Sequence, residues 1–185
     1  MRAPVPPPLK RFIWDIQSMV ELAESEREIL VIGRVLMARL VASDDWLPDD
    51  FAVPDKKECQ QYLLYGDGLE RFSVVSTVFH GGQTMPVCQD RVWEIRGLLR
   101  GSRGAQHFPW EPGSAPRPKG DAKLVKSGSV DVVSPKNGES RRERFHQHSC
   151  LWGRHRKDPS SCARCRWYGT RFHPRLREPC RFARL

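Results

Sequence analysis

Three side chains that can bind a metal ion lie close together near the middle of the sequence. Cys88, Asp90 and Glu94 fall between Gly82 and Gly101, and a thiolate with two carboxylates could hold a divalent cation. Because all three ligands can be anionic, they would concentrate negative charge and disfavour a further anionic ligand on the ion. The alternative is a metal-free arrangement in which Cys88 is a small buried hydrophobic residue.

A second group of metal-binding side chains lies near the C-terminus. Cys162 and Cys165 form a short-spaced pair, and Cys150 and Cys180 could complete a zinc site. With the many arginines around it, such a site could bind nucleic acid through the phosphates, and nearby aromatic side chains could stack on bases. The alternative is a solvated polycation that binds nucleic acid only weakly and without specificity.

Charge divides the chain into two parts. The formal net charge is +9, and residues 139–185 hold 12 Arg and one Lys against three Glu and one Asp, so residues 1–138 are neutral overall. The C-terminal part has no Ile and no Val, and therefore little with which to build buried strands. We expect a Pro-rich start over residues 1–8, one domain over residues 9–138, and a basic, largely irregular tail over residues 139–185.

The elements that would position the central ligands follow from the apolar pattern. Helical spacing predicts a helix over residues 9–24, and a capping box at Ser25 and Glu28 begins a second helix that ends near Ser43. Short β-prone runs predict strands at 62–65, 71–79, 92–99, 122–125 and 130–133. Two helices followed by short strands indicate an α+β domain, mainly β, with an antiparallel sandwich or small barrel. The stripe expected to face the core in the second helix is Ile29, Ile32, Val35, Leu36 and Leu40.

No apolar run is long enough for a signal peptide or for a membrane span. We therefore expect a cytoplasmic protein without a membrane partner, whose cysteines stay reduced.

The sequence over residues 63–101 carries a resemblance to a known family. Its strand-like Phe72-Ser-Val-Val-Ser-Thr-Val-Phe79, the Gly82-Gln-Thr-Met-Pro86 turn and Gly97-Leu-Leu-Arg-Gly101 resemble the central region of bacterial cysteine and 3-mercaptopropionate dioxygenases. Later segments around residues 118–122 and 129–135 agree, so the resemblance covers about residues 9–138. It implies N-terminal helices packed on a cupin barrel, that is, a double-stranded β-helix or jelly roll.

The resemblance also implies a chemistry. Members of that family bind Fe(II) with three neutral histidines and oxidise a small thiol, cysteine or 3-mercaptopropionate, to its sulfinate with O2. Here Cys88 and Asp90 stand where the first two histidines are expected, and Glu94 stands where many cupins, though not usually thiol dioxygenases, place a metal-binding carboxylate. We therefore expect a cysteine dioxygenase-type protein that is inactive or degenerate in this chain.

The C-terminal part departs from the family. The third iron histidine and the strands that follow it have no match in residues 139–185, so the resemblance implies a truncated barrel. Rewritten in plausible codons and read one base later, residues 145–151 and 153–158 can give strings like the family's last strands. We therefore hypothesise an out-of-frame tail that starts near Glu139. The alternative function is a nucleic-acid-binding protein with a zinc- and arginine-rich tail on a metal-free cupin scaffold.

Overall fold

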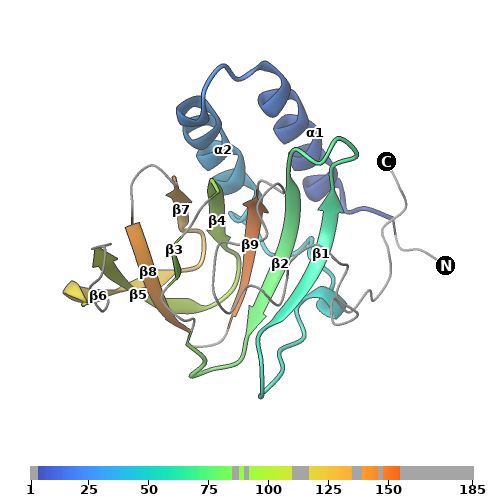
Figure 1. Ribbon diagram of the computed structural model, residues 1–185. Helices are drawn as coiled ribbons and strands as arrows, with labels where there is room; N and C mark the ends of the chain where they lie inside the picture. Colours follow the sequence, from blue (N-terminus) through green and yellow to red (C-terminus); the bar gives the residue numbers. More distant parts are fainter. Residues whose placement is uncertain are drawn as a thin grey trace.

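Two helices and a short 3-10 turn precede two antiparallel β-sheets (Figure 1). The computed structural model describes residues 4–84, 88–89, 92–109, 117–134, 139–145 and 148–154. In chain order the elements are α1 (Pro7–Leu22), α2 (Glu26–Leu40), η1 (Asp49–Phe51), β1 (Gln60–Gly66), β2 (Ser73–Phe79), β3 (Cys88–Gln89), β4 (Glu94–Leu98), β5 (Ser102–Pro109), β6 (Lys119–Lys126), β7 (Val130–Val133), β8 (Glu139–Phe145) and β9 (His148–Arg154). The described chain is thus α+β and mainly β, as the sequence predicts.

The structure confirms the main hydrogen bond of the capping box predicted at the start of α2. The hydroxyl oxygen of Ser25 accepts a hydrogen bond from the backbone N–H of Glu28 at 3.3 Å. The carboxylate of Glu28 turns back one residue further than expected and accepts from the N–H of Glu24 at 3.0 Å. Both contacts satisfy backbone donors that have no partner inside a helix. Pro7 begins α1 in a similar way, because a proline at the first turn lacks only an N–H that would have no helical partner.

Both helices cover one face of the five-stranded sheet, and a large apolar core lies between them. The end of α2 approaches this sheet closely at Gly97 of β4. A Cβ atom added there would lie 2.6 Å from Cγ1 of Val41 and 2.8 Å from Met37, which is closer than packed atoms tolerate. Gly97 is therefore the point where the end of α2 rests on the sheet.

The apolar stripe predicted for α2 is wider than the face of the helix that is buried in the structure. Leu36, Met37 and Leu40 are buried, whereas Ile32 and Val35, expected in the same stripe, are exposed. A stripe read from spacing alone cannot tell which of its edges faces the core, because the sheet contacts only part of it.

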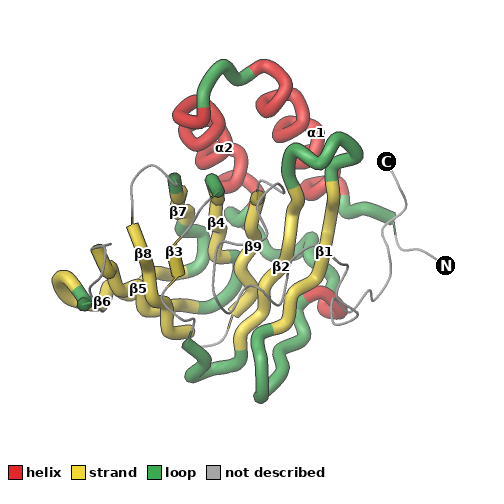
Figure 2. The backbone as a smooth tube through the Cα atoms, viewed as in Figure 1, coloured by secondary structure: helices red, strands yellow, loops and turns green. Residues whose placement is uncertain are grey.

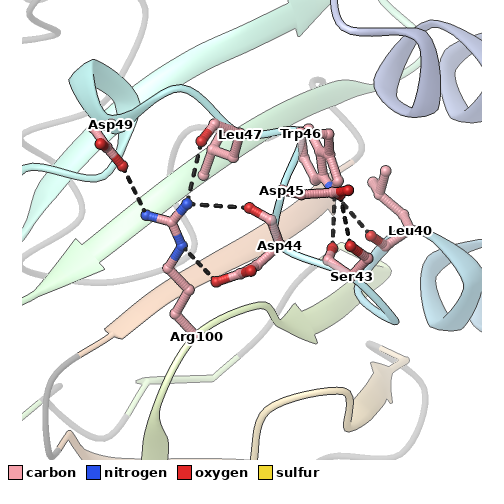
Figure 3. Close-up of polar contacts among 8 residues, drawn as sticks. All are labelled: Leu40, Ser43, Asp44, Asp45, Trp46, Leu47, Asp49 and Arg100. Atoms are coloured by element: carbon pink, nitrogen blue, oxygen red, sulfur yellow. Dashed lines mark hydrogen bonds and ion pairs between the residues drawn. The ribbon is translucent and has the colours of Figure 1, made fainter.

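The loop after α2 is fixed to the end of β4 by one arginine (Figure 3). The Nε atom of Arg100 donates to the carboxylate of Asp44 at 3.0 Å, and its Nη1 atom donates to Asp49 at 3.3 Å. Its Nη2 atom reaches the carbonyl oxygens of Asp44 and Leu47 at 3.1 and 3.2 Å. Beside it, the indole N–H of Trp46 donates to the carbonyl of Leu40 at 2.9 Å, so the chain leaving α2 is held on both sides.

The order of strands shows how the sheets are built. The five-stranded sheet has the order β1-β2-β9-β4-β7, and the four-stranded sheet has the order β3-β8-β5-β6. Every pair is antiparallel. Figure 2 shows the two groups of strands beside each other, with the helices above the larger one in this view.

Both sheets continue past the domain boundary expected at residue 138. β8 and β9 belong to the part of the chain expected to be irregular, and β9 lies in the middle of the five-stranded sheet. The physical reason is that strand pairing uses backbone groups, so the long edges of β2 and β4 can be paired by a segment with few β-branched residues. Residues 155–185 lie outside the described residues, and truncation of the barrel stays a prediction.

None of the described helices is long and apolar enough to cross a membrane.

Candidate functional site

The predicted central metal ligands are distributed over two sheets. Cys88 lies in β3 of the four-stranded sheet, where its backbone pairs with Arg141. Glu94 begins β4 of the five-stranded sheet, and Asp90 lies outside the described residues. Within the part of the chain that the structure describes, no three His, Cys, Asp or Glu side chains are grouped so that they could hold a metal ion.

The predicted zinc ligands cannot all be placed. Cys150 lies in β9, opposite Thr77 of β2 and Leu98 of β4. Cys162, Cys165 and Cys180 lie outside the described residues. A zinc site that includes Cys150 would therefore need a ligand from the centre of the five-stranded sheet.

The alternation of side chains along β4 separates an apolar face from a charged one. Ile95 and Gly97 point toward α2, as their close approaches to Gly33 and Met37 show. Glu94, Arg96 and Leu98 therefore face the other way. Leu98 packs there with Phe79 of β2 and with Val125 of β6, a strand of the four-stranded sheet. The charged face of β4 thus looks into the interior between the two sheets.

Glu94 is buried in this interior together with an arginine. Its side chain is almost fully buried, and that of Arg96, two residues further along the strand, is 7% exposed. The Nε and Nη2 atoms of Arg96 both donate to Oε2 of Glu94, at 2.8 and 2.5 Å. A buried carboxylate is stable as an anion only beside such a partner, because burial removes its hydration.

The pair is part of a longer series of charges. Asp131 of β7 lies directly opposite Arg96 across the β4–β7 ladder, and residues opposite each other share one face. The carboxylate of Asp131 forms an ion pair with Arg103 of β5, whose side chain is 3% exposed. We call Glu94, Arg96, Asp131 and Arg103 the interior charge chain. It contains two anions and two cations, and it joins the two sheets.

One further polar group faces the same interior. Thr77 of β2 shares its side of the sheet with Phe79, and its hydroxyl is buried without a hydrogen-bond partner among the described residues. The only opposite position on β9 belongs to Cys150, whose side chain is not among the described ones. Thr77 is thus a buried polar group on the same inner face of the sheet as Phe79.

The structure disfavours a divalent cation at Glu94. The guanidinium of Arg96 occupies one of the two carboxylate oxygens, Oε2, and it would repel a second cation bound at short range. Arg96 also supplies the charge that a metal would otherwise supply to Glu94. The residues that hold Glu94 are therefore those of a structural ion pair.

Sequence reasoning missed Arg96, Arg103 and Asp131. The signal was present, since Glu94-Ile-Arg96 puts two opposite charges on one face of a strand. The spacing of Glu94 from Gly82 and Gly101 also fits a metal motif, so spacing alone does not distinguish a metal ligand from a member of an ion pair.

A second polar cluster fixes the β1–β2 turn to α1. Asp67 is 3% exposed and accepts from the Nε atom of Arg71 at 2.9 Å and from its Nη2 atom at 3.2 Å. The hydrogen bond from Arg71 holds the pKa of Asp67 below its ordinary value. Tyr65 accepts from the amide of Gln17 at 2.9 Å, and burial, with the nearby charge of Asp67, raises the pKa of its phenol.

Comparisons with known proteins show similarity to cupins at a low level. No protein-family profile matches the chain. A Klebsiella pneumoniae protein with a double-stranded β-helix domain is 13% identical, with a TM-score of 0.45, over 60% of this chain and 82% of that one. KdgF from Halomonas sp. is 12% identical, with a TM-score of 0.43, over 60% and 94%. A cupin superfamily protein from Desulfitobacterium hafniense is 10% identical, with a TM-score of 0.41, over 56% and 82%. At this level of similarity, the function has to be inferred from the residues of the chain itself.

Proposed function

We propose that this chain is a thiol dioxygenase-like cupin protein that has lost iron-dependent oxidation and keeps the domain as a scaffold. The observation that carries the proposal is the buried ion pair between Glu94 and Arg96. Glu94 occupies the position at which the motif spacing predicts a metal ligand. Its carboxylate is instead bound to Arg96 inside the protein.

The chemistry of the other two motif positions supports the same conclusion. In the family that the sequence resembles, Fe(II) would bring a small thiol and O2 together on an open face of three neutral ligands. Cys88 and Asp90 stand where two of the imidazoles are expected. A thiolate and a carboxylate carry negative charge, which opposes the approach of a thiol substrate as its anion.

The interior charge chain suits a scaffold better than a reaction site. Its two cations and two anions balance one another, and the Arg103–Asp131 pair connects strands of different sheets. Replacing Arg96 would remove a cation that contacts the buried Glu94 carboxylate, and replacing Asp131 would remove an anion that contacts the buried Arg103 guanidinium. The chain of charges therefore fixes how the sheets pack.

Oxygen consumption by the full-length protein tests the proposal. After anaerobic loading with Fe(II), uptake of O2 with cysteine or 3-mercaptopropionate should not exceed that of the same Fe(II) in buffer. Circular dichroism on the same sample would establish that the protein is folded. Thiol-dependent uptake above that control, with the sulfinate as product and with loss of activity in Glu94→Gln, would overturn the proposal.

A further inference from the structure

The outer face of α2 carries apolar side chains that are exposed in the part of the chain that the structure describes. Val31, Ile32 and Val35 are 60%, 46% and 58% exposed, although valine and isoleucine usually lie inside a protein. Their spacing puts all three on one side of the helix. The opposite side, with Leu36, Met37 and Leu40, is buried against the domain, and Figure 2 shows α2 at the upper edge of the molecule with the sheets below it.

Charges at the two ends of this face have opposite signs. Glu28 lies about one turn before the apolar side chains and Arg39 about one turn after them, and both are exposed. Glu28 uses one carboxylate oxygen for the helix cap. Arg39 contacts Asp15 of α1 at 3.7 Å, and its side chain is 62% exposed. Both charges therefore stay accessible to a partner.

This arrangement is complementary to itself. In an antiparallel pair of α2 helices, Glu28 of each copy meets Arg39 of the other, and the midpoint between these positions falls within the apolar side chains. A two-fold pair of this kind satisfies both ends at once, as an isologous interface requires. A partner with a uniformly charged surface would match only one end.

We propose that the outer face of α2, defined by Glu28, Val31, Ile32, Val35 and Arg39, binds a second copy of this chain as an antiparallel helix pair. The apolar centre supplies the burial, and the terminal charges set the antiparallel direction. Because a single helix face offers little area, the dimer forms at high protein concentration and dissociates on dilution.

Sedimentation of the full-length protein across a range of concentrations tests the proposal. The wild-type chain should shift from monomer to dimer as the concentration rises. Val35→Asp places a charge in the apolar centre and should leave the protein monomeric at every concentration. Val53→Asp is the matched control, since Val53 is a 50% exposed valine outside α2, and it should dimerise as the wild type does.

Charge exchange gives the sharper test. Glu28→Arg and Arg39→Glu should each weaken self-association, because each puts like charges together at both ends of the pair. An equimolar mixture of the two variants should associate again, as a heterodimer. Thermal unfolding of each variant would establish that it is folded. A wild-type chain that stays monomeric, a dimer that survives Val35→Asp, or two variants that fail to associate when mixed would each overturn the proposal.

Discussion

Glu94 and Arg96 form a buried ion pair on β4. Replacing one of the two residues should lower the free energy of unfolding more than replacing both together. Arg96→Met removes a cation that contacts the buried Glu94 carboxylate, which should lower the free energy of unfolding by about 3–5 kcal/mol. Glu94→Gln together with Arg96→Met removes both charges and should recover much of this loss. Urea unfolding of the three proteins measures the difference.

An exposed ion pair provides the control for this cycle. Arg39 and Asp15 are 3.7 Å apart, with 62% of the arginine side chain exposed, so Arg39→Met should change the free energy of unfolding by at most about 1 kcal/mol. Equal effects of Arg39→Met and Arg96→Met would contradict the interior position of the Glu94–Arg96 pair.

Asp67 should make stability depend on pH in acid. Its pKa in the folded protein is lowered by the hydrogen bond from Arg71, so the folded state favours the anion. The stabilisation is complete above the pKa of the unfolded-state carboxyl, about 3.9, and is lost as the pH falls through the lower folded-state value. Unfolding of wild type and Asp67→Asn between neutral pH and acid should show curves that converge as the pH falls. A constant difference between them at all pH values would contradict this role.

At the scale of elements, the tail is expected to divide into two parts at Arg154. Removal of residues 139–185 takes away β8 and β9 and leaves the facing edges of β2 and β4 without their shared partner. Removal of residues 155–185 keeps every described strand. The first truncation should lower the melting temperature by many degrees or prevent folding, and the second should change it little.

Thermal unfolding of both truncated proteins and of the full chain is the measurement. Equal melting temperatures for the full chain and the protein that ends at residue 138 would contradict the central place of β9. A much lower melting temperature for the protein that ends at Arg154 would contradict the division of the tail into two parts.

The elements that the sequence predicts well are those whose pattern is local. The capping contact at Ser25 and the β-prone run that forms β2 can be recognised without knowing the fold. β5, β8 and β9 were missed because their residues are largely polar and their strand conformation depends on pairing with neighbours distant in sequence. The candidate site was half predicted, since the motif indicates Glu94 but only the three-dimensional arrangement gives it Arg96 as a partner.

At the scale of the whole molecule, positive charge is concentrated in residues 139–185. We expect the full chain to bind single-stranded DNA or RNA weakly, and the binding to disappear at moderate salt because purely ionic contacts are screened. Zinc and the double substitution Cys162→Ser and Cys165→Ser should leave this binding unchanged. Fluorescence anisotropy at several salt concentrations is the measurement, and affinity that requires zinc and both cysteines would instead support the zinc-dependent alternative.

We propose that the motif positions Cys88, Asp90 and Glu94 do not form an iron site, and iron stoichiometry tests this claim most directly. The full-length protein is loaded anaerobically with Fe(II), passed over a desalting column and submitted to elemental analysis beside Asp90→Asn and Glu94→Gln. The buried Glu94–Arg96 pair predicts far less than one iron per chain in all three proteins, with no difference among them. Nearly one iron per wild-type chain that is lost in either variant would contradict the claim.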